Sequence, residues 1–284
     1  MTISDAKNFL ITGASSGLGQ ALGRAALASG HRVFGTVRDS AARSAFEALS
    51  PGRAVAPILD ITHPNDIERV VAELEKEFGS IDVLVNNAGY GHEGVIEESD
   101  LDELRRQFEV NVFGTIAVTK SVLPYMRRRR KGRIITITSM GGLVAFPGVG
   151  YYCASKFALE GFSETLRQEV AAFGIGVTAV EPGSFRTDWA GRSMRRSARS
   201  ISDYDALFEP LRHRRQEYSG RQLGDPAKAA AAILKLVDSA APPAHLILGT
   251  DALSFVQKKL DELRREMAAW ESTTTSTNVD ANTR

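Results

Sequence analysis

The sequence predicts a single α/β domain, built on a doubly wound, mostly parallel sheet of about seven strands with helices on both faces. Two observations carry this prediction. Short β-branched runs alternate with longer amphipathic segments along most of the 284 residues. Several runs show little alternation of polar and apolar residues, which is typical of strands that helices cover on both faces. The segments between the runs are long enough for the crossover helices that parallel strands need.

The order of the elements follows from these runs. The predicted strands are residues 8–12, 32–37, 54–59, 81–85, 133–138, 176–180 and 245–249. Helical spacing is clearest after Lys156, where apolar residues recur at Leu159, Phe162, Leu166 and Val170. Sheets of this kind bind ligands beyond the carboxyl ends of their strands. The loops that follow the strands are therefore where functional residues are expected.

The domain is predicted to span residues 1–270. Its last part, 254–270, has an extra amphipathic helix whose role is open: it could contact a partner, cover a substrate cleft or simply pack. From 271 to 284, Ser, Thr and Asn replace apolar residues, and this composition predicts a disordered tail.

Composition excludes several classes of protein. A net charge of +1 gives no global attraction to nucleic acid or membrane, and 43% hydrophobic residues is ordinary for a globular domain. Cys153 is the only cysteine, so no intrachain disulfide forms, and core packing is its expected role. The apolar run at 8–12 is too short for a signal-peptide core or a membrane span. Cytoplasmic residence is expected, and no metal site is predicted.

The first predicted strand leads directly into "TGASSGLG", Thr12 to Gly19, and then into a helical segment. Glycines in such a turn permit a tight bend, close approach of a pyrophosphate and close helix packing, while the helix N-terminus faces the anion. Glycines are also common in ordinary turns. Because a strand precedes this turn and a helix follows it, dinucleotide binding is favoured. The predicted contacts are Gly13, Ser15, Ser16, Gly17, Leu18 and Gly19.

Further motifs follow in a fixed order. They are Asp60, "NNAG" (86–89), Asn111, Ser139, Tyr152, Lys156 and "PGSFRT" (182–187). With the G-x-x-x-G-x-G spacing of the turn, this series resembles the short-chain dehydrogenase/reductase family, in the branch with TGxxxGxG and YxxxK motifs. Each motif alone is weak, whereas their order and spacing together are specific. The resemblance implies a Rossmann-type fold, an NAD(P)-dependent oxidoreductase acting on CH–OH or C=O groups, and a homodimer or homotetramer.

The end of the second predicted strand indicates which cofactor is used. Enzymes of this fold usually have an acid there to hold the ribose hydroxyls of NAD. Here the neutral Val37 stands at that position and Arg38 follows, which can pair with a 2′-phosphate and stack on adenine. NADP is therefore favoured over NAD. The alternative is a solvated arginine, because Asp39 is adjacent and Ser16 is not the basic residue that NADP-dependent relatives often have.

The resemblance also implies the remaining cofactor contacts. Asp60 and Ile61 would contact the adenine, and Thr187 would meet the nicotinamide amide. The remaining residues of the cofactor bed would be Asn87, Ala88, Gly89, Tyr152, Lys156, Pro182 and Gly183.

The segment "GYYCASK" raises the question of which tyrosine does chemistry. On a helix, Tyr152 and Lys156 lie about 40° apart on one face, whereas Tyr151 lies about 140° from the lysine. A tyrosine has a pKa of about 10, too high for an efficient base near neutrality, and a nearby ammonium would lower it. Tyr152 is therefore the candidate acid/base, although a lone Y-x-x-x-K is more often plain packing.

The resemblance completes the catalytic set. It implies that Ser139 holds the substrate oxygen, that Lys156 also grips the nicotinamide ribose, and that Asn111 positions a proton-relaying water. Taken alone, Ser139 could cap a strand end, and Asn111 could be a satisfied core amide. The expected substrate is a small alcohol or ketone, with Ser139, Tyr152, Phe185 and Trp189 lining its site.

Two arginine-rich segments are harder to interpret. The segment 188–221, called the lid here, matches a stretch that often covers the substrate in this family. Its residues Arg192, Arg195, Arg196 and Arg199 either receive a carboxylate or phosphate or are solvated. The run 127–133 resembles a nucleic-acid patch, but it ends a predicted helix, where cations complement the macrodipole. No nucleic-acid or membrane partner is therefore expected. Two rival functions are a non-catalytic NADP-sensing protein and a dehydratase or epimerase on the same fold.

Overall fold

The computed structural model describes residues 6–279. Its centre is a seven-stranded sheet in the order β3-β2-β1-β4-β6-β7-β9, in which every neighbouring pair is parallel. The chain starts at β1 in the middle, winds outward to β3, then crosses to β4 and winds out to β9. This reversal of direction between β1 and β4 makes the sheet doubly wound, as predicted.

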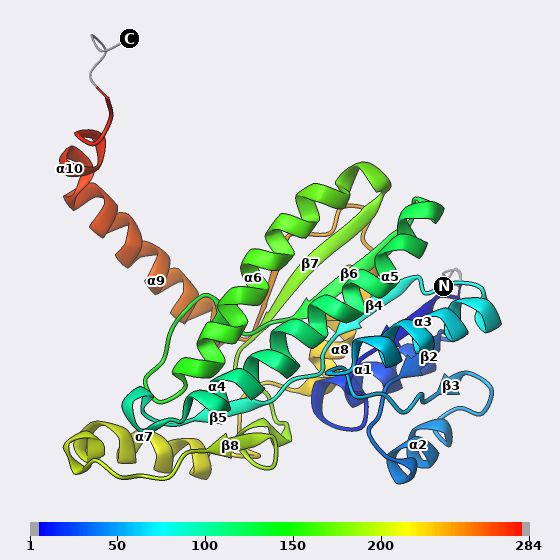
Figure 1. Cartoon of the computed structure of the whole chain (residues 1–284), viewed down its shortest axis with the longest axis horizontal. Helices are drawn as coiled ribbons and strands as arrows, with labels where there is room; N and C mark the ends of the chain where they lie inside the picture. Colours follow the sequence, from blue (N-terminus) through cyan, green and yellow to red (C-terminus); the bar gives the residue numbers. More distant parts are fainter. Residues whose placement is uncertain (1–5, 280–284) are drawn as a thin grey trace.

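The first half of the chain supplies four strands of this sheet and the helices between them (Figure 1). The elements are β1 (Asn8–Ile11), α1 (Gly17–Ala28), β2 (Arg32–Gly35), α2 (Ser40–Glu47), β3 (Ala54–Val55), α3 (Pro64–Phe78) and β4 (Val83–Asn86). After β4 come β5 (Gly91–Glu93), α4 (Leu101–Phe108), a π-helical turn (Glu109–Gly114) and α5 (Thr115–Arg129).

The second half supplies the remaining strands and the lid. The elements are β6 (Gly132–Ile137), α6 (Gly150–Val170), β7 (Ile175–Pro182), β8 (Met194–Arg196), α7 (Asp205–Glu217), α8 (Pro226–Val237), β9 (His245–Leu248), α9 (Thr250–Ala269) and α10 (Glu271–Thr275). Short 3-10 turns occupy Ile96–Glu98, Met140–Gly142, Ala171–Phe173, Asp188–Ala190 and Ser202–Tyr204.

Two apolar layers hold the sheet between its helices. Side chains alternate along β1, so that Phe9 and Ile11 pack toward α1 and α8 while Leu10 packs toward α3, α5 and α6. All three residues are at most 1% exposed. Burial on both faces explains why these strands read as continuous apolar runs rather than as alternating ones. The helices thereby fix the carboxyl ends of the strands, where the loops of the site begin.

Two features were not predicted. The run 54–59 forms only the two-residue β3, joined to the end of β2 by an isolated bridge between Val37 and Ile58. In addition, β5 pairs in parallel with β8 in a separate two-stranded sheet outside the main one. This second sheet attaches the lid to the loop that follows β4.

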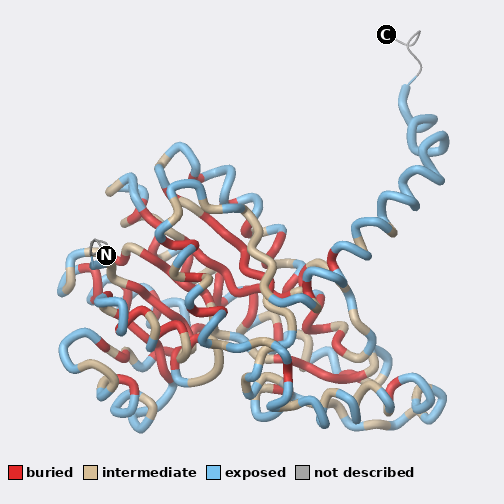
Figure 2. Tube along the Cα trace, turned by 180° about the vertical axis from the view of Figure 1, so that it is seen from behind, coloured by how far each residue is buried: buried red, intermediate tan, exposed pale blue. Residues whose placement is uncertain are grey.

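The C-terminal helix α9 projects away from the body of the molecule (Figure 1). Only Ala252 and Val256 of α9 are buried, and α9 is exposed along most of its length (Figure 2). Its base is anchored where Phe255 meets Phe146 edge-on, with ring centroids 5.3 Å apart. Plain packing therefore accounts for the start of the helix and not for its outer half, where Leu260, Leu263, Met267 and Trp270 are exposed.

The predicted disordered tail differs from the structure at its start. Residues Glu271–Thr275 form α10, in which the Thr274 hydroxyl donates to the Trp270 carbonyl and the Thr275 hydroxyl to the Glu271 carbonyl. These side chains bond to the helix backbone, which composition alone does not reveal. The end of the predicted tail, 280–284, lies outside the described residues.

Candidate active site

The glycine-rich turn after β1 has a backbone that fits a pyrophosphate. Gly13 and Gly17 have φ of +67° and +56°, a region that side chains disfavour. A Cβ on Gly19 would lie 2.5 Å from the Gly13 carbonyl oxygen, so that position admits only glycine without movement of the backbone. The turn leads into α1, which has neither a side-chain cap nor an acid in its first turn. Its N-terminal N–H groups are therefore oriented for an anion.

The loop after β4 holds this turn in place. The Asn87 side-chain amide donates to the carbonyls of Thr12 and Gly13, at 2.9 and 3.0 Å. In return, the Thr12 hydroxyl accepts from the backbone N–H groups of Asn87 and Ala88, at 2.9 and 3.0 Å. The predicted pyrophosphate turn and the first part of "NNAG" are thus one rigid unit.

The adenine side of the site contains the predicted basic residue. Val37 is buried, whereas Arg38 is exposed directly after it. Asp39, which could have paired with Arg38, instead caps α2 by accepting from the Ala42 N–H at 2.8 Å. The pKa of Asp60 is lowered, mainly by the Thr62 N–H and to a small extent by the charge of Arg38. Arg38 therefore lies close to Asp60, at the edge where the adenine ribose is predicted to bind.

Residues from the loop after β4, the π-helical turn and α6 lie close together at the other end of the cofactor bed. A Cβ on Gly89 would lie 3.1 Å from Asn111 Oδ1 and 3.8 Å from Lys156 Nζ. On the opposite side, a Cβ on Gly17 would lie 3.6 Å from the Thr187 side chain. The phosphate turn is thus close to the segment after β7, and Gly89 is close to the catalytic candidates.

The α6 helix separates the two tyrosines of "GYYCASK". The Tyr151 hydroxyl donates to the Ser99 carbonyl at 2.8 Å, and its ring stacks on His92, so Tyr151 is structural. Tyr152 lies on the face of Lys156, whose Nζ is 5.7 Å from the ring centroid. Ser139 lies beside it, because a Cβ on Gly141 would be 3.3 Å from both Ser139 Oγ and the Tyr152 ring.

Burial controls the ionisation of this pair. It raises the pKa of Tyr152 above its usual value, and the nearby Ser139 hydroxyl and Trp189 indole only partly oppose that rise. Burial also lowers the pKa of Lys156 to about 8, while the charge of Glu160 raises it. The Lys156 ammonium donates to the Ile137 carbonyl at 2.9 Å. In this structure desolvation outweighs the groups that lower the pKa of the phenol, and the lowering expected from Lys156 together with a bound nicotinamide stays a prediction.

Asn111 occupies the π-helical turn between α4 and α5, and it is fully buried. Its Oδ1 accepts from the Tyr90 N–H, and its Nδ2 donates to the Tyr90 carbonyl and to the Ser155 hydroxyl, all at 3.1 Å. Turns of this type often occur at functional sites. Sequence reasoning missed Tyr90 and Ser155, which hold Asn111, because neither belongs to a motif.

An apolar wall stands next to the phenol. Tyr152, Val149 and Cys153 form a buried cluster against Phe146 and Trp189, and the Trp189 ring lies 5.0 Å from that of Tyr152. Cys153 packs in this wall as predicted, and burial raises the pKa of its thiol. Trp189 is thus close to the predicted reacting group. Phe185 instead packs on Gly224, where a Cβ would lie 2.6 Å from its ring.

The lid arginines pair within the chain. Arg196 and Arg215 both bind the buried carboxylate of Glu93, each at 2.8 Å. Arg199 pairs with Glu98 at 3.0 Å, and Arg192 with Asp188 at 2.8 Å. Of the four arginines predicted to receive an anion, Arg192, Arg196 and Arg199 are thus paired with carboxylates of the protein itself. The fourth, Arg195, is exposed.

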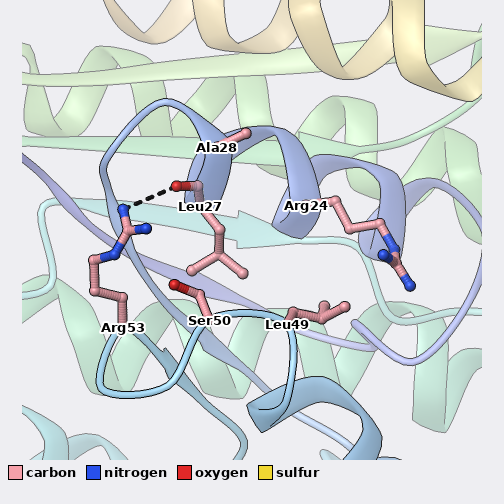
Figure 3. A pocket seen from close by; sticks show the side chains of 6 residues that line it. All are labelled: Arg24, Leu27, Ala28, Leu49, Ser50 and Arg53. Carbon is pink, nitrogen blue, oxygen red and sulfur yellow. Dashed lines mark hydrogen bonds between the residues drawn. The ribbon is translucent and has the colours of Figure 1, made fainter.

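A separate pocket lies between the end of α1 and the turn before β3 (Figure 3). Its lining residues are Arg24, Leu27, Ala28, Leu49, Ser50 and Arg53. Arg53 crosses it to donate to the Leu27 carbonyl at 2.9 Å. None of these residues belongs to the predicted site, which lies at the carboxyl ends of the strands.

Comparison with known proteins gives a consistent result. Residues 7–197 match the model of the short chain dehydrogenase family. A protein named oxidoreductase BOA17, from Botryotinia fuckeliana, is 37% identical over 93% of this chain and 96% of its own length. No helix within residues 6–279 has both the length and the hydropathy needed to cross a membrane.

Solved structures agree with this match. A short-chain dehydrogenase from Streptomyces avermitilis superposes with a TM-score of 0.91 at 43% identity, covering 97% of this chain and 99% of its own. The structure of ElxO with NADP bound superposes with a TM-score of 0.73 at 26% identity, covering 88% and 99%.

Proposed function

The chain belongs to the short-chain dehydrogenase family, and we propose that it is an NADP-dependent oxidoreductase that interconverts an alcohol and a carbonyl, with Tyr152 as general acid/base. One observation carries this proposal. The phenol of Tyr152 lies in one buried group with Ser139 and Lys156, next to the bed formed by Gly89 and Asn111.

When bound, the nicotinamide cofactor supplies or accepts the hydride. The residues of the chain manage the proton. In the reducing direction, the Tyr152 hydroxyl would donate its proton to the substrate oxygen while the Ser139 hydroxyl holds that oxygen. Because burial raises its pKa, the phenol holds its proton at neutral pH, which is the form that a general acid needs before it donates. Oxidation would use the reverse transfer, assisted by the ammonium of Lys156.

Asn111 would act behind these residues. Because its amide is fixed by Tyr90 and Ser155, its position is set before any ligand binds. A water held near Asn111 and Lys156 could return a proton to the phenol after each turnover. This relay follows from the family resemblance and is part of the proposal.

The preference for NADP rests on Arg38. Arg38 is exposed and its charge acts weakly on Asp60, and the neighbouring acid Asp39 is occupied in capping α2. The 2′-phosphate of NADP would give this arginine a bidentate partner. ElxO, the structural relative described above, has been solved with NADP bound.

The apolar wall favours a substrate whose carbonyl is attached to a hydrocarbon group. Phe146, Val149 and Trp189 pack in one apolar group with the phenol. Arg196 and Arg199 of the lid pair with carboxylates of the chain. Residence in the cytoplasm and a homodimer or homotetramer are also part of the proposal. Leu101 on α4 and Phe113 in the π-helical turn between α4 and α5 are exposed, and they offer such an assembly an apolar surface.

The decisive experiment compares two tyrosine variants. NADPH absorbance would be followed while ketones, aldehydes and quinones are offered to the wild type, Tyr152→Phe and Tyr151→Phe. Tyr152→Phe should lower kcat by about 1,000-fold, because its proton donor is gone. Tyr151→Phe is the matched control, since it loses only the bond to Ser99 and should keep its activity at a cost of about 1 kcal/mol in stability.

Binding must be measured alongside turnover. At 100 times its dissociation constant, NADPH should stabilise both variants by about 2.7 kcal/mol, as it does the wild type. Near-normal turnover by Tyr152→Phe would defeat the assignment of the acid/base. A wild type that binds NADPH but turns over none of the panel would favour the sensing protein or the dehydratase/epimerase instead.

A further inference from the structure

A cluster of ionisable side chains lies behind the catalytic helix and takes no part in the proposed chemistry. Glu160 comes from α6, Glu181 from the end of β7, and His245 from the start of β9. One nitrogen or oxygen of each residue lies within 4.8 Å of the others. The three elements are adjacent in the fold, since β7 pairs with β9 and α6 packs on β7.

Three of the four oxygens of these two buried carboxylates accept no hydrogen bond from the described residues. Glu160 is 4% exposed and Glu181 is 0% exposed. Within residues 6–279, neither oxygen of Glu160 accepts a hydrogen bond, and Oε2 of Glu181 accepts none. The nearby Thr138 hydroxyl is used elsewhere, because it donates to the Val180 carbonyl at 3.0 Å. Buried carboxylates are normally paired, hydrogen-bonded or bound to a cation.

We propose that Glu160, Glu181 and His245 form a binding site for a divalent cation that accepts nitrogen and oxygen ligands, with Zn²⁺ as the best match. Imidazole nitrogen and carboxylate oxygen are both ligands of Zn²⁺, and three protein ligands plus one water complete an open four-coordinate zinc site. Mg²⁺ prefers oxygen ligands, so the imidazole nitrogen would contribute little to its affinity. The cation would take the place of protons on the two buried carboxylates.

The ligand geometry suits a small cation. His245 Nδ1 lies 2.8 Å from Glu181 Oε1 and 3.6 Å from Glu160 Oε2. Zinc bonds of about 2.1 Å set tetrahedral neighbours about 3.4 Å apart, so side-chain movements of under about 1 Å would complete the site. The His245 side chain is 35% exposed, which leaves a route from solvent for the cation and room for a water as fourth ligand.

The other ring nitrogen of His245 has the partner that metal-binding histidines usually have. Its Nε2 lies 3.5 Å from the Glu164 carboxylate, one turn after Glu160 on α6. A carboxylate in this position fixes the orientation of the ring and keeps the opposite nitrogen free for a metal. Glu164 is exposed and would act as a positioning residue, not as a ligand.

The site would fasten α6 to the last two strands of the sheet. Glu160 lies one helical turn after Lys156, so the cation would brace the helix that carries Tyr152 without touching the reacting groups. The expected effect is on stability and cation affinity. It can be measured without cofactor or substrate, and its failure would leave the proposed oxidoreductase function untouched.

The test uses the full chain after removal of metals with a chelator. Titration with Zn²⁺ followed by calorimetry should show one site per chain, and saturating Zn²⁺ should raise the melting temperature by about 5 °C. His245→Asn and Glu181→Gln should each abolish this rise. Glu164→Gln should weaken zinc affinity by about 10- to 100-fold, as loss of an orienting carboxylate does. His213→Asn, an exposed histidine on α7, is the matched control and should respond as the wild type does.

Several results would overturn the assignment. A wild type with no zinc-dependent shift would mean that protons neutralise the carboxylates. An unchanged zinc affinity in His245→Asn would mean that zinc binds elsewhere. Because the His245 side chain is partly exposed, this variant should fold, and it keeps the test valid if Glu181→Gln does not fold. An equal response to Mg²⁺ would exclude the imidazole as a ligand. A lost response in His213→Asn would assign the effect to surface histidines.

Discussion

The phosphate turn and the lid are built in opposite ways. The turn, Thr12 to Gly19, is held by backbone geometry, with the Asn87 amide bonded to two of its carbonyls. The lid, 188–221, is held by contacts with distant segments: β8 pairs with β5, and lid arginines bond to carboxylates about one hundred residues earlier in the chain, such as Glu93 and Glu98. A tight turn requires particular residues within a short stretch and can therefore be predicted from its motif. A pairing between distant segments has no such motif.

The same contrast explains which parts of the fold were predictable. Six of the seven predicted strands form close to their predicted bounds, because strands that are buried on both faces consist of nearly continuous apolar residues. The run 54–59 shrinks to two residues, and the β5–β8 pair was missed altogether. That pair joins Gly91 to Met194, and neither three-residue segment has a pattern long enough to predict.

At the candidate site, the residues that belong to motifs could be predicted from the sequence. The residues that hydrogen-bond to them and fix their positions could not. Ser139, Tyr152 and Lys156 meet as the spacing and the resemblance imply. The supports of Asn111, namely Tyr90 and Ser155, follow only from three-dimensional contact. The high pKa of Tyr152 also depends on burial, which depends on how Trp189 and the rest of the wall pack. A sequence gives the charges near a group more readily than its desolvation.

The largest effect is expected when the carboxylate of Glu93, which pairs with two lid arginines, is removed. Glu93→Gln leaves Arg196 and Arg215 without their shared carboxylate, which is 1% exposed, and should lower the free energy of unfolding by about 4 kcal/mol. Because β5 carries the lid strand β8, the KM for substrate should rise while NADPH binding is retained. Chemical denaturation and steady-state kinetics measure the two effects.

The control for this variant is Asp188→Asn, which removes an exposed ion pair with Arg192 in the same lid. It should change stability by less than about 1 kcal/mol. If Glu93→Gln were equally mild, the lid would be held by something other than buried charge, and the contrast with the phosphate turn would lose its basis.

The second test places a methyl group in the phosphate turn. In Gly19→Ala, the new Cβ would lie 2.4 Å from Asn87 Nδ2 and 2.5 Å from the Gly13 carbonyl oxygen, so the turn must shift. We expect a loss of about 2 kcal/mol in stability, because such overpacking typically costs this much, together with weaker NADPH binding. The lid should be unaffected, so the KM for substrate at saturating NADPH should stay close to that of the wild type.

Gly161→Ala is the matched control, since a Cβ at this helical position meets nothing within 4 Å. It should stabilise the protein by up to about 1 kcal/mol through helix propensity. Thermal melts with and without NADPH separate the two variants. Normal cofactor binding by Gly19→Ala would show that the turn adapts and is not the rigid unit described above.

The smallest effect is expected at Arg38, whose charge is proposed to bind the 2′-phosphate of NADP. Arg38→Gln should weaken NADPH binding about 10-fold, or about 1.4 kcal/mol, because an exposed guanidinium–phosphate contact is lost. NADH binding should not change, since NADH lacks the 2′-phosphate, and Arg24→Gln on α1 should alter neither. Calorimetric titration with both cofactors measures this difference. An equal loss for NADH would mean that Arg38 only supports the adenine, and the choice of NADP would then need a different residue.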